Sequence, residues 1–468
     1  MLFNTFAFAV FFAVVLLLYW LIPGRMKTHC LLVTSYFFYA FWDWRFLLLI
    51  IAISIANFHL TRVMGDKLGR SRKQLLVAIV SLNLVALATF KYLNFFLESF
   101  RSLVRSIGFE PSFTVINIIL PLGISFITFK AISYAVDVYR QELEPTTSMI
   151  EFGIFLSYFP YMIAGPIMSA KAMLPQFRAL PTKLTSSEIN SALLLIALGF
   201  FKKTVIGDYS APLVNRIFGN NTYFDWKTLL IGIFAFSLQI YGDFSGYSDM
   251  ARGISRLLGI ELMRNFKEPY LSRNITEFWR NWHISLSTWF RKYLYIPLGG
   301  NRVNFNRGLL NLLIVMTIAG LWHGAALTFL IWGAIQGLLL IVHKLVVRVN
   351  PLSGLFTYFP LLSTIKIGIT FCTISLVWVF FRADSFHTAT EMLTRIAGKA
   401  GGTFDRMDFL QLLILLAISF STDLIIRRYR SARYVLGTYS SGLVVGILFA
   451  IALSFRASEI VPFVYFQF

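Results

Sequence analysis

The sequence predicts an all-α protein, a polytopic bundle of transmembrane helices. Hydrophobic residues make up 57% of the 468-residue chain and charged residues only 14%, and the mean hydropathy is +0.70. This composition lies far from that of soluble globular proteins. Long uncharged runs recur at residues 1–24, 75–90, 112–129, 152–170, 308–343 and 434–455. Because one crossing needs about 20 mostly apolar residues, we expect roughly ten to twelve membrane helices.

The first run and the basic clusters predict a topology. Residues 1–24 lack the basic region and the small-residue cleavage site of a signal peptide, so we expect a retained helix. Basic residues concentrate at 62–73 and 427–433, and such clusters stay in the cytoplasm. Residues 434–455 then provide one crossing, which places the apolar tail 456–468 outside the cytoplasm. We expect the amino terminus to be extracytoplasmic as well.

The same cytoplasmic loops explain the net charge of +20. The charges lie between hydrophobic spans and form no known nucleic-acid-binding module, so the expected partner is membrane lipid and not nucleic acid. Cys30 and Cys372 lie in apolar runs. We expect both to be small buried hydrophobic side chains rather than disulfide partners or metal ligands.

We expect one membrane domain over residues 1–468. Its parts are amino-terminal transmembrane helices (1–242), a cytoplasmic-side or interfacial segment (243–307), further transmembrane helices (308–455) and the external tail (456–468). Residues 243–307 are the least hydrophobic, with ten basic and five acidic residues. Within them, the periodicity of residues 277–293 predicts one amphipathic helix with three tryptophans on its apolar face, lying in the membrane interface.

His323 is the first candidate functional residue. It lies near the middle of residues 308–343, a run without Asp, Glu, Lys or Arg. An ionisable side chain in the hydrocarbon is costly and usually marks function, although a structural histidine bonded to a carbonyl is the alternative. Gly320 and Gly324 flank it at a spacing that permits either close helix approach or room for a ligand.

The other histidines give weaker signals. His283 lies on the predicted polar face of residues 277–293, between Arg280 and Arg291, where a solvated histidine is the simpler interpretation. It lies 40 residues from His323, and the two histidines could still meet in space. The remaining four are at ends of apolar runs and receive a structural interpretation: His29, His59, His343 and His387. Without a carboxylate or cysteine cluster beside them, we expect no metal site.

A polar stretch, YGDFSGYSDMARG, occupies residues 241–253. Asp243, Ser245, Ser248 and Asp249 close an apolar run there, with glycines among them. The pattern is more typical of a capped helix end or a turn leaving the membrane than of a catalytic site.

A buried neutral imidazole is a suitable general base for a hydroxyl that attacks a thioester. Anionic cytoplasmic thioesters, such as acetyl-CoA or an acylated carrier protein, would dock on basic loops. These features are compatible with acyl transfer across a membrane, as one hypothesis among several.

Three stretches together resemble the membrane-bound O-acyltransferase (MBOAT) family: YGDFSGYSDMARG, EFWRNWHISLSTWFRKYLYIPLGGNR and GLWHGA. The similarity is greatest to the branch of alginate and peptidoglycan O-acetyltransferases, with teichoic acid D-alanyltransferases more distant. It is strong over 241–337 and extends to the apolar amino-terminal run and the terminal PFVYFQF.

The resemblance implies helices around a central funnel in a bacterial inner membrane, with His323 as the catalytic histidine and His283 as the second family histidine. It implies an acetyl group moving from a cytoplasmic thioester to a cell-envelope polysaccharide, with a periplasmic SGNH-hydrolase-like acetyltransferase as partner and no permanently bound cofactor. The terminal pattern Phe463, Tyr465 and Phe468 would carry the acyl group on its tyrosine. Substrate and donor contacts are expected from Trp322, Arg280, Arg291, Asp243, Ser245, Asp249 and Gln336.

One position departs from the family pattern. Relatives often have a histidine where this chain has Gln336, and glutamine forms hydrogen bonds but does not shuttle a proton at neutral pH. Two other functions stay open from the sequence. One is direct acylation of a lipid or glycolipid, with the tail only packing, and the other is transport of an acylated substrate with His323 as gate or proton relay.

Overall fold

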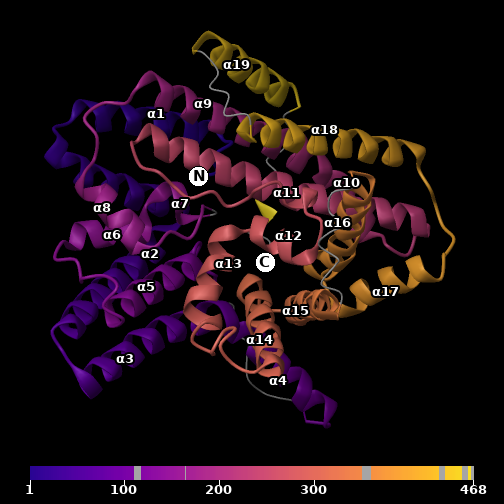
Figure 1. The fold of residues 1–468 in the computed structure, drawn as a ribbon, viewed down its shortest axis with the longest axis horizontal. Helices are drawn as coiled ribbons and strands as arrows, with labels where there is room; N and C mark the ends of the chain where they lie inside the picture. The colour runs from indigo at the N-terminus through magenta and orange to yellow at the C-terminus, as the bar shows by residue number, and fades with distance from the viewer. Residues whose placement is uncertain (110–117, 164, 350–359, 432–437, 456–461, 465–468) are drawn as a thin grey trace. The chain divides into compact units, whose positions relative to one another are not determined.

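The computed structural model describes residues 1–109, 118–163, 165–349, 360–431, 438–455 and 462–464. Over these residues the regular structure is helical, apart from an isolated β-bridge between Phe224 and Thr403 (Figure 1). The all-α prediction is therefore confirmed. The chain divides into two compact units, one of Met1–Ala192 with Ile254–Met263 and one of Leu193–Gly253 with Arg264–Phe468.

The first unit contains eight helices and the start of a ninth within the described residues. They are α1 (Phe6–Leu21), α2 (Gly24–Gly65), α3 (Gly69–Leu87), α4 (Leu93–Ser106), α5 (Ile124–Tyr139), α6 (Met149–Ser157), α7 (Phe159–Met162), α8 (Ala170–Arg178) and α9 (Ser186–Phe201), with the π-helix η1 (Ala88–Tyr92) between α3 and α4. The α2 helix is kinked at Asp43, whose φ and ψ of −159° and 113° are not helical.

The second unit takes the rest of the chain. Its helices are α10 (Tyr209–Gly219), α11 (Trp226–Leu257), α12 (Ile275–Asn281), α13 (Ile284–Phe290), α14 (Phe305–His323), α15 (Leu327–Val349), α16 (Pro360–Arg382), α17 (Phe386–Ala397), α18 (Arg406–Ser431) and α19 (Thr438–Ser454). Shorter elements are the π-helices η2 (Lys202–Asp208) and η4 (Arg291–Tyr295) and the 3-10 turn η3 (Pro269–Leu271). The last turn of α11 belongs to the first unit.

Eight helices in the described residues are long and apolar enough to cross a membrane, and α1 and residues 440–454 form shorter apolar helices. Many large apolar side chains on these helices are exposed, among them Phe6, Val85 and Leu361. A polypeptide with this much exposed apolar surface is suited to lipid and not to water. The protein is therefore a multi-pass membrane protein. The crossing expected at 434–455 corresponds to α19, and residues 434–437 lie outside the described ranges.

Side-chain caps set several helix starts. The side chains of Thr5, Asn304 and Ser385 each accept a backbone N–H in the first turn of the helix that follows. Such caps satisfy donors that have no partner inside the helix. The structure thus begins α14, the helix that carries His323, at a residue type that favours a helix start.

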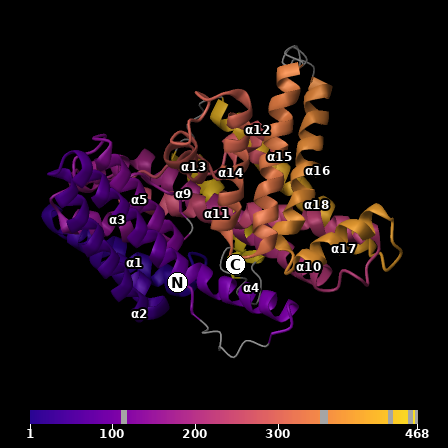
Figure 2. The ribbon, with the colours of Figure 1, turned by 90° about the horizontal axis from the view of Figure 1, so that it is seen from below.

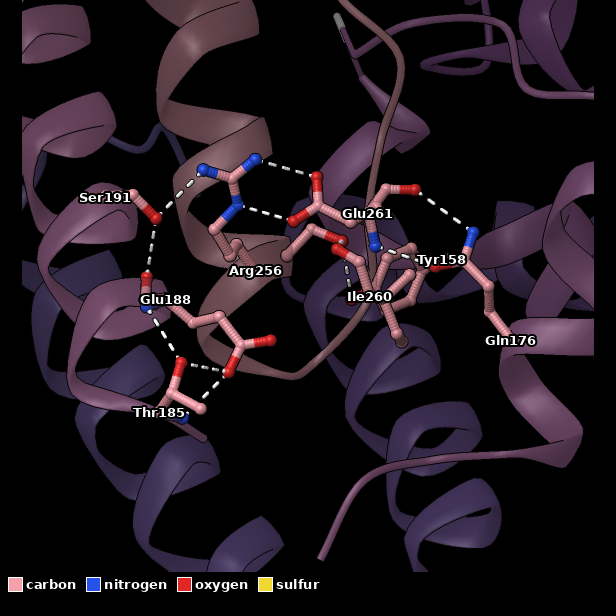
Figure 3. A network of polar contacts seen from close by, with 9 residues as sticks. Tyr158, Gln176, Thr185, Glu188, Ser191, Arg256, Ile260 and Glu261 are labelled. Carbon is pink, nitrogen blue, oxygen red and sulfur yellow. Dashed lines mark hydrogen bonds and ion pairs between the residues drawn. The ribbon is translucent and has the colours of Figure 1, made fainter. Parts of the chain in front are cut away.

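The first unit is held together by apolar packing and by a polar network at its edge. One buried cluster joins α2, α3 and α5 through Tyr39, Ile50, Ile53, Leu87, Ile124 and Ile127. In Figure 3, the Arg256 guanidinium forms two hydrogen bonds with the Glu261 carboxylate and a third with Ser191. The Glu261 backbone N–H donates to Gln176 at 2.7 Å. This network ties the end of α11 to α8 and α9.

In the second unit, α14 and α15 form a helical hairpin, visible in Figure 2. The indoles of Trp332 on α15 and Trp378 on α16 stack with ring centroids 5.4 Å apart, and both are buried. The cysteines differ from the expectation: both are free, but Cys30 is only half-buried and Cys372 is exposed. Cys372 lies on α16, a helix of membrane length, so an apolar environment does not require burial within the protein.

Candidate active site

His323 is the last residue of α14. The helix ends because Gly324 is extended, with φ and ψ of −157° and 151°, and α15 begins at Leu327. The uncharged run 308–343 therefore folds as two helices, and His323 lies at their turn, not midway along one helix. Its side chain is buried.

Glycines allow the two helices of the hairpin to touch. A Cβ atom on Gly320 would lie 2.2 Å from the carbonyl oxygen of Phe329 and 3.0 Å from the Cα of Gly333. Of the two options left open for Gly320, close helix approach or room for a ligand, the structure shows close helix approach. At Gly324, the Phe329 ring fills the space where a ligand was the other option, since a Cβ there would lie 2.1 Å from it.

Aromatic rings surround the His323 imidazole. Its centroid lies 5.1 Å from Trp322, 5.2 Å from Trp332 and 5.3 Å from Phe381. These rings come from α14, α15 and α16, so three helices fix the imidazole. An aromatic enclosure of this kind limits water, and charge interactions at a reacting group are stronger in a poorly hydrated site.

His283 lies at a break between α12 and α13. Its backbone is left-handed, with φ of 42° and ψ of 54°, and its side chain is 0% exposed. The predictions of one continuous helix over 277–293 and of a polar-face histidine are both wrong. The break turns His283 inward, while Phe278, Trp282 and Leu286 are buried as the apolar periodicity predicted.

Asn265 determines the tautomer of His283. The Asn265 Oδ1 accepts the backbone N–H of Ser285 at 3.1 Å, so this atom is an oxygen, and it faces the His283 Nδ1 at 3.3 Å. The proton of a neutral His283 therefore lies on Nδ1, which leaves the lone pair on Nε2. The Nε2 atom is buried and has no hydrogen-bond partner among the described residues. Burial lowers the pKa of His283 from 6.5 to about 3, so the imidazole is neutral at pH 7.

The two histidines meet. Their ring centroids are 6.4 Å apart, and the Trp322 ring lies 6.1 Å from that of His283. The hypothesis that residues 40 positions apart in sequence come together is confirmed. The neutral imidazole of His283 therefore lies beside the His323 ring.

A cavity of about 260 Å³ opens beside His323. Its wall is mostly apolar, and both arginines expected in donor binding, Arg280 and Arg291, belong to it. Its lining comprises Thr276, Trp279, Arg280, Leu286, Ser287, Phe290, Arg291, Tyr295, Leu312, Val315, Met316, Ala319, His323 and Leu340. The cavity thus combines a mostly apolar wall with two arginine side chains and a buried histidine.

The polar stretch 241–253 lies inside α11 and does not end it, so the predicted helix end or turn is wrong. Buried partners keep the helix intact: Asp243 pairs with Lys203 at 2.5 Å, and Asp249 pairs with Lys202 at 2.8 Å. Ser245 is also buried. The segment expected at 243–307 on the cytoplasmic side therefore begins within a helix of membrane length. Asp243, Ser245 and Asp249 do not line the cavity beside His323, and their expected role in donor binding stays a prediction.

Gln336 is fully buried on α15. Its Oε1 accepts the indole N–H of Trp279 at 3.2 Å, which connects it to the cavity wall. Its Nε2 has no hydrogen-bond partner among the described residues. The position therefore supports the cavity through a hydrogen bond, in agreement with what glutamine can do.

The tail approaches the same site. Tyr465 and Phe468 lie outside the described residues, but Phe463 is buried, with its ring 5.8 Å from Phe244 and 5.0 Å from Tyr247. The Phe244 ring in turn lies 4.7 Å from that of His283. The rings of Phe463 and His283 thus contact the same Phe244 ring, which places the tail beside the second histidine.

Two contributors were missed at the level of sequence. Asn265 gave no local signal, because its importance depends on residues 18 and 20 positions later. Lys203 did give one, since Lys202 and Lys203 interrupt an apolar run of membrane length. Within the described ranges, no group of three or more His, Cys, Asp or Glu side chains converges as metal ligands would.

Comparison with known proteins now identifies the family. Residues 139–381 match the profile of MBOAT, the membrane-bound O-acyltransferase family. The chain belongs to this family. It is 40% identical over 395 residues to the probable alginate O-acetylase AlgI of Pseudomonas aeruginosa, covering 83% of this chain and 73% of that protein.

Two further relatives extend the comparison. The peptidoglycan O-acetyltransferase of Helicobacter pylori is 36% identical over 434 residues, covering 86% of this chain and 80% of the relative. The teichoic acid D-alanyltransferase of Streptococcus thermophilus is 30% identical over 235 residues, covering 47% and 56%. The protein is an O-acyltransferase of the MBOAT family, as the resemblance of its motifs implied.

Proposed function

We propose that this MBOAT protein takes an acetyl group from a cytoplasmic thioester, acetyl-CoA or an acyl-carrier thioester, and delivers it for O-acetylation of a cell-envelope polysaccharide such as alginate or peptidoglycan. It does so across the bacterial inner membrane, with both termini outside the cytoplasm. The observation that carries this proposal is the burial of Phe463 and Val464 close to the histidine pair. The acetyl-transferring relatives support the choice of acetyl group.

His323 is the general base in this proposal. A hydroxyl attacks the thioester carbonyl while the imidazole accepts its proton, and the tetrahedral intermediate then expels the thiolate. That thiolate takes the proton from His323, so an ester and a free thiol result and the histidine returns to its neutral form. Such proton transfer contributes about 10²- to 10⁴-fold to the rate.

Tyr465 is the acceptor hydroxyl. It is one residue beyond Val464, and a residue advances the chain by at most about 3.6 Å. The tyrosine ester then passes its acetyl group to a periplasmic SGNH-hydrolase-like transferase, which acetylates the polysaccharide. His283 stays neutral and offers its Nε2 lone pair as a hydrogen-bond acceptor for the donor. Arg280 and Arg291, exposed beside the cavity, bind the donor's phosphates.

The test is O-acetyl content of the envelope polysaccharide in cells that depend on this gene. His323→Ala should lower it at least 100-fold. Tyr465→Phe should do the same, because phenylalanine keeps the packing and removes the nucleophile. Normal acetylation with Tyr465→Phe would contradict the relay and indicate direct transfer onto a lipid or glycolipid. Normal acetylation with His323→Ala would contradict the catalytic role.

A further inference from the structure

Glycines bring the backbones of η2 and α11 into contact inside the second unit. A Cβ atom on Gly207 would lie 2.9 Å from the backbone nitrogen of Asp243, and one on Gly246 would lie 2.9 Å from the backbone nitrogen of Lys203. No side chain larger than hydrogen fits between the two helices at these positions. This contact brings Lys203 of η2 alongside Asp243 of α11.

Lys203 is fully buried between two carboxylates. Its Nζ lies 2.5 Å from Asp243 Oδ1 and 2.5 Å from Asp208 Oδ1. Charges buried in this way are expensive unless paired, and intramembrane ionisable groups are commonly functional. The pair also leaves the second oxygen of the Asp243 carboxylate available for another donor.

That donor is the tail. The Val464 backbone N–H donates to Asp243 Oδ2 at 2.7 Å, across 221 residues of sequence. The adjoining Phe463 ring packs against Phe244 and Tyr247, which lie on α11 beside Asp243. The tail therefore has one polar and one aromatic anchor on a single helix.

We propose that the Asp243 carboxylate, oriented by Lys203, is the receptor for the carboxyl-terminal segment and positions the residue after Val464 for acyl transfer. In this proposal Asp243 is a positioning residue, a role separate from the donor binding expected from sequence. Its meaning for catalysis rests on the proposed function, because the positioned residue is Tyr465. The binding contact itself does not depend on that function.

The neighbouring ion pair provides a matched control. Lys202 and Asp249 are 2.8 Å apart, and Asp249 also pairs with Arg252 at 3.3 Å. These residues belong to the same two helices, η2 and α11, as Lys203 and Asp243. Among the described residues, Asp249 forms no hydrogen bond or ion pair with Phe463 or Val464. A change at Asp249 thus perturbs a charge pair between the same elements without removing a tail contact.

The experiment measures thiol accessibility at the tail anchor in the full-length protein. Cys30 and Cys372 are replaced by alanine, Val464→Cys is introduced, and labelling by N-ethylmaleimide is followed by intact mass. Val464 is only 1% exposed, so the parent should label slowly. Asp243→Ala should accelerate labelling at least tenfold, and Asp249→Asn should leave the rate within twofold.

The labelling rate of Asp243→Asn should lie between those of the parent and of Asp243→Ala. The amide oxygen still accepts the Val464 N–H, but the ion pair with Lys203 is lost. This variant keeps the test decisive should Asp243→Ala fail to fold, which size-exclusion chromatography reports. Slow labelling in a folded Asp243→Ala, or in Asp243→Asn if only that variant folds, would overturn the receptor. Equal acceleration by Asp249→Asn would overturn it too, since the effect would then be general loosening.

Acylation of Tyr465, measured with native cysteines and Val464 in place, separates this inference from the proposed function. If both hold, Asp243→Ala lowers the yield of acylated Tyr465 at least tenfold. Faster labelling with Asp243→Ala, in a protein that never acylates Tyr465, would support the binding of the tail by Asp243 and contradict the acylation of Tyr465. Acylation of Tyr465, together with a labelling rate that Asp243→Ala does not change, would support the acyl relay and contradict the binding of the tail by Asp243.

Discussion

Gly320 and Gly333 face each other where α14 and α15 cross, three residues before His323. We predict that Gly320→Ala impairs catalysis by moving His323 and leaves the chemistry of the site unchanged. The added Cβ would lie 2.2 Å from the Phe329 carbonyl oxygen, a backbone atom that cannot rotate away. Ordinary contact begins at 3.4 Å, so the helices must separate by about 1.2 Å.

The structure sets the size of this effect. Overpacking of this kind costs about 1–3 kcal/mol of stability. The larger consequence is positional, because His323 ends α14 and its imidazole is fixed against Trp332 of α15. A misplacement of about 1 Å at a catalytic group can reduce the rate by about 10²-fold. We therefore expect a folded protein whose acetyl-transfer rate falls about 30- to 100-fold.

The assay is single-turnover acetyl transfer from labelled donor by purified protein, with thermal denaturation in the same detergent. Gly368→Ala on α16 is the control, since a Cβ there meets no atom within 4 Å. It should retain both rate and stability. A wild-type transfer rate with Gly320→Ala would refute the argument that glycine contact at this crossing positions His323.

Three further predictions follow from the cavity and the second histidine. For His283, the unfolded imidazole takes up a proton below its ordinary pKa of 6.5, whereas burial keeps the folded one neutral until about pH 3. This site therefore lowers the free energy of unfolding by about 1.4 kcal/mol per pH unit as pH falls through that window. His283→Asn, which tolerates the left-handed backbone, should reduce this loss of stability at low pH, as measured by thermal denaturation. A pH dependence of stability identical to that of the wild type would contradict the prediction. Gln336→Leu leaves the Trp279 N–H without its acceptor and should cost about 1–3 kcal/mol of stability. Adding Trp279→Phe should recover part of this, and no recovery would contradict the hydrogen-bond account. Arg280→Ala and Arg291→Ala should each raise the donor KM about tenfold at unchanged kcat, since a charged hydrogen bond is worth about 1.5–3 kcal/mol. A donor KM equal to that of the wild type would contradict the role of these arginines in donor binding.

The helical class was predictable because the signal is compositional and repeated. Long uncharged runs specify membrane helices whatever their packing, and a histidine in such a run is expensive enough to be conspicuous. His323 was found for that reason. The turn after it was not, because Gly324 differs little from Gly320 in sequence, and only the packing of Phe329 distinguishes them.

Two errors have a shared physical origin. The periodicity of residues 277–293 suits one helix, but the break at His283 is stabilised by Asn265, which local pattern cannot reveal. Asp243 and Asp249 suggested a helix end, because polar residues and glycines that close an apolar run are typical of a cap or a turn. Their partners, Lys203 and Lys202, lie 40 and 47 residues earlier, so the charges are paired and the helix continues.

Mass spectrometry of the carboxyl-terminal peptide is the most direct test of the central claim that His323 transfers an acyl group to Tyr465. Purified protein is incubated with labelled acetyl-CoA, beside His323→Ala and Tyr465→Phe. We predict label on Tyr465 in the wild type, and none on the tail in either variant. Consumption of the donor by wild-type protein, with no label on the tail peptide, would contradict the account.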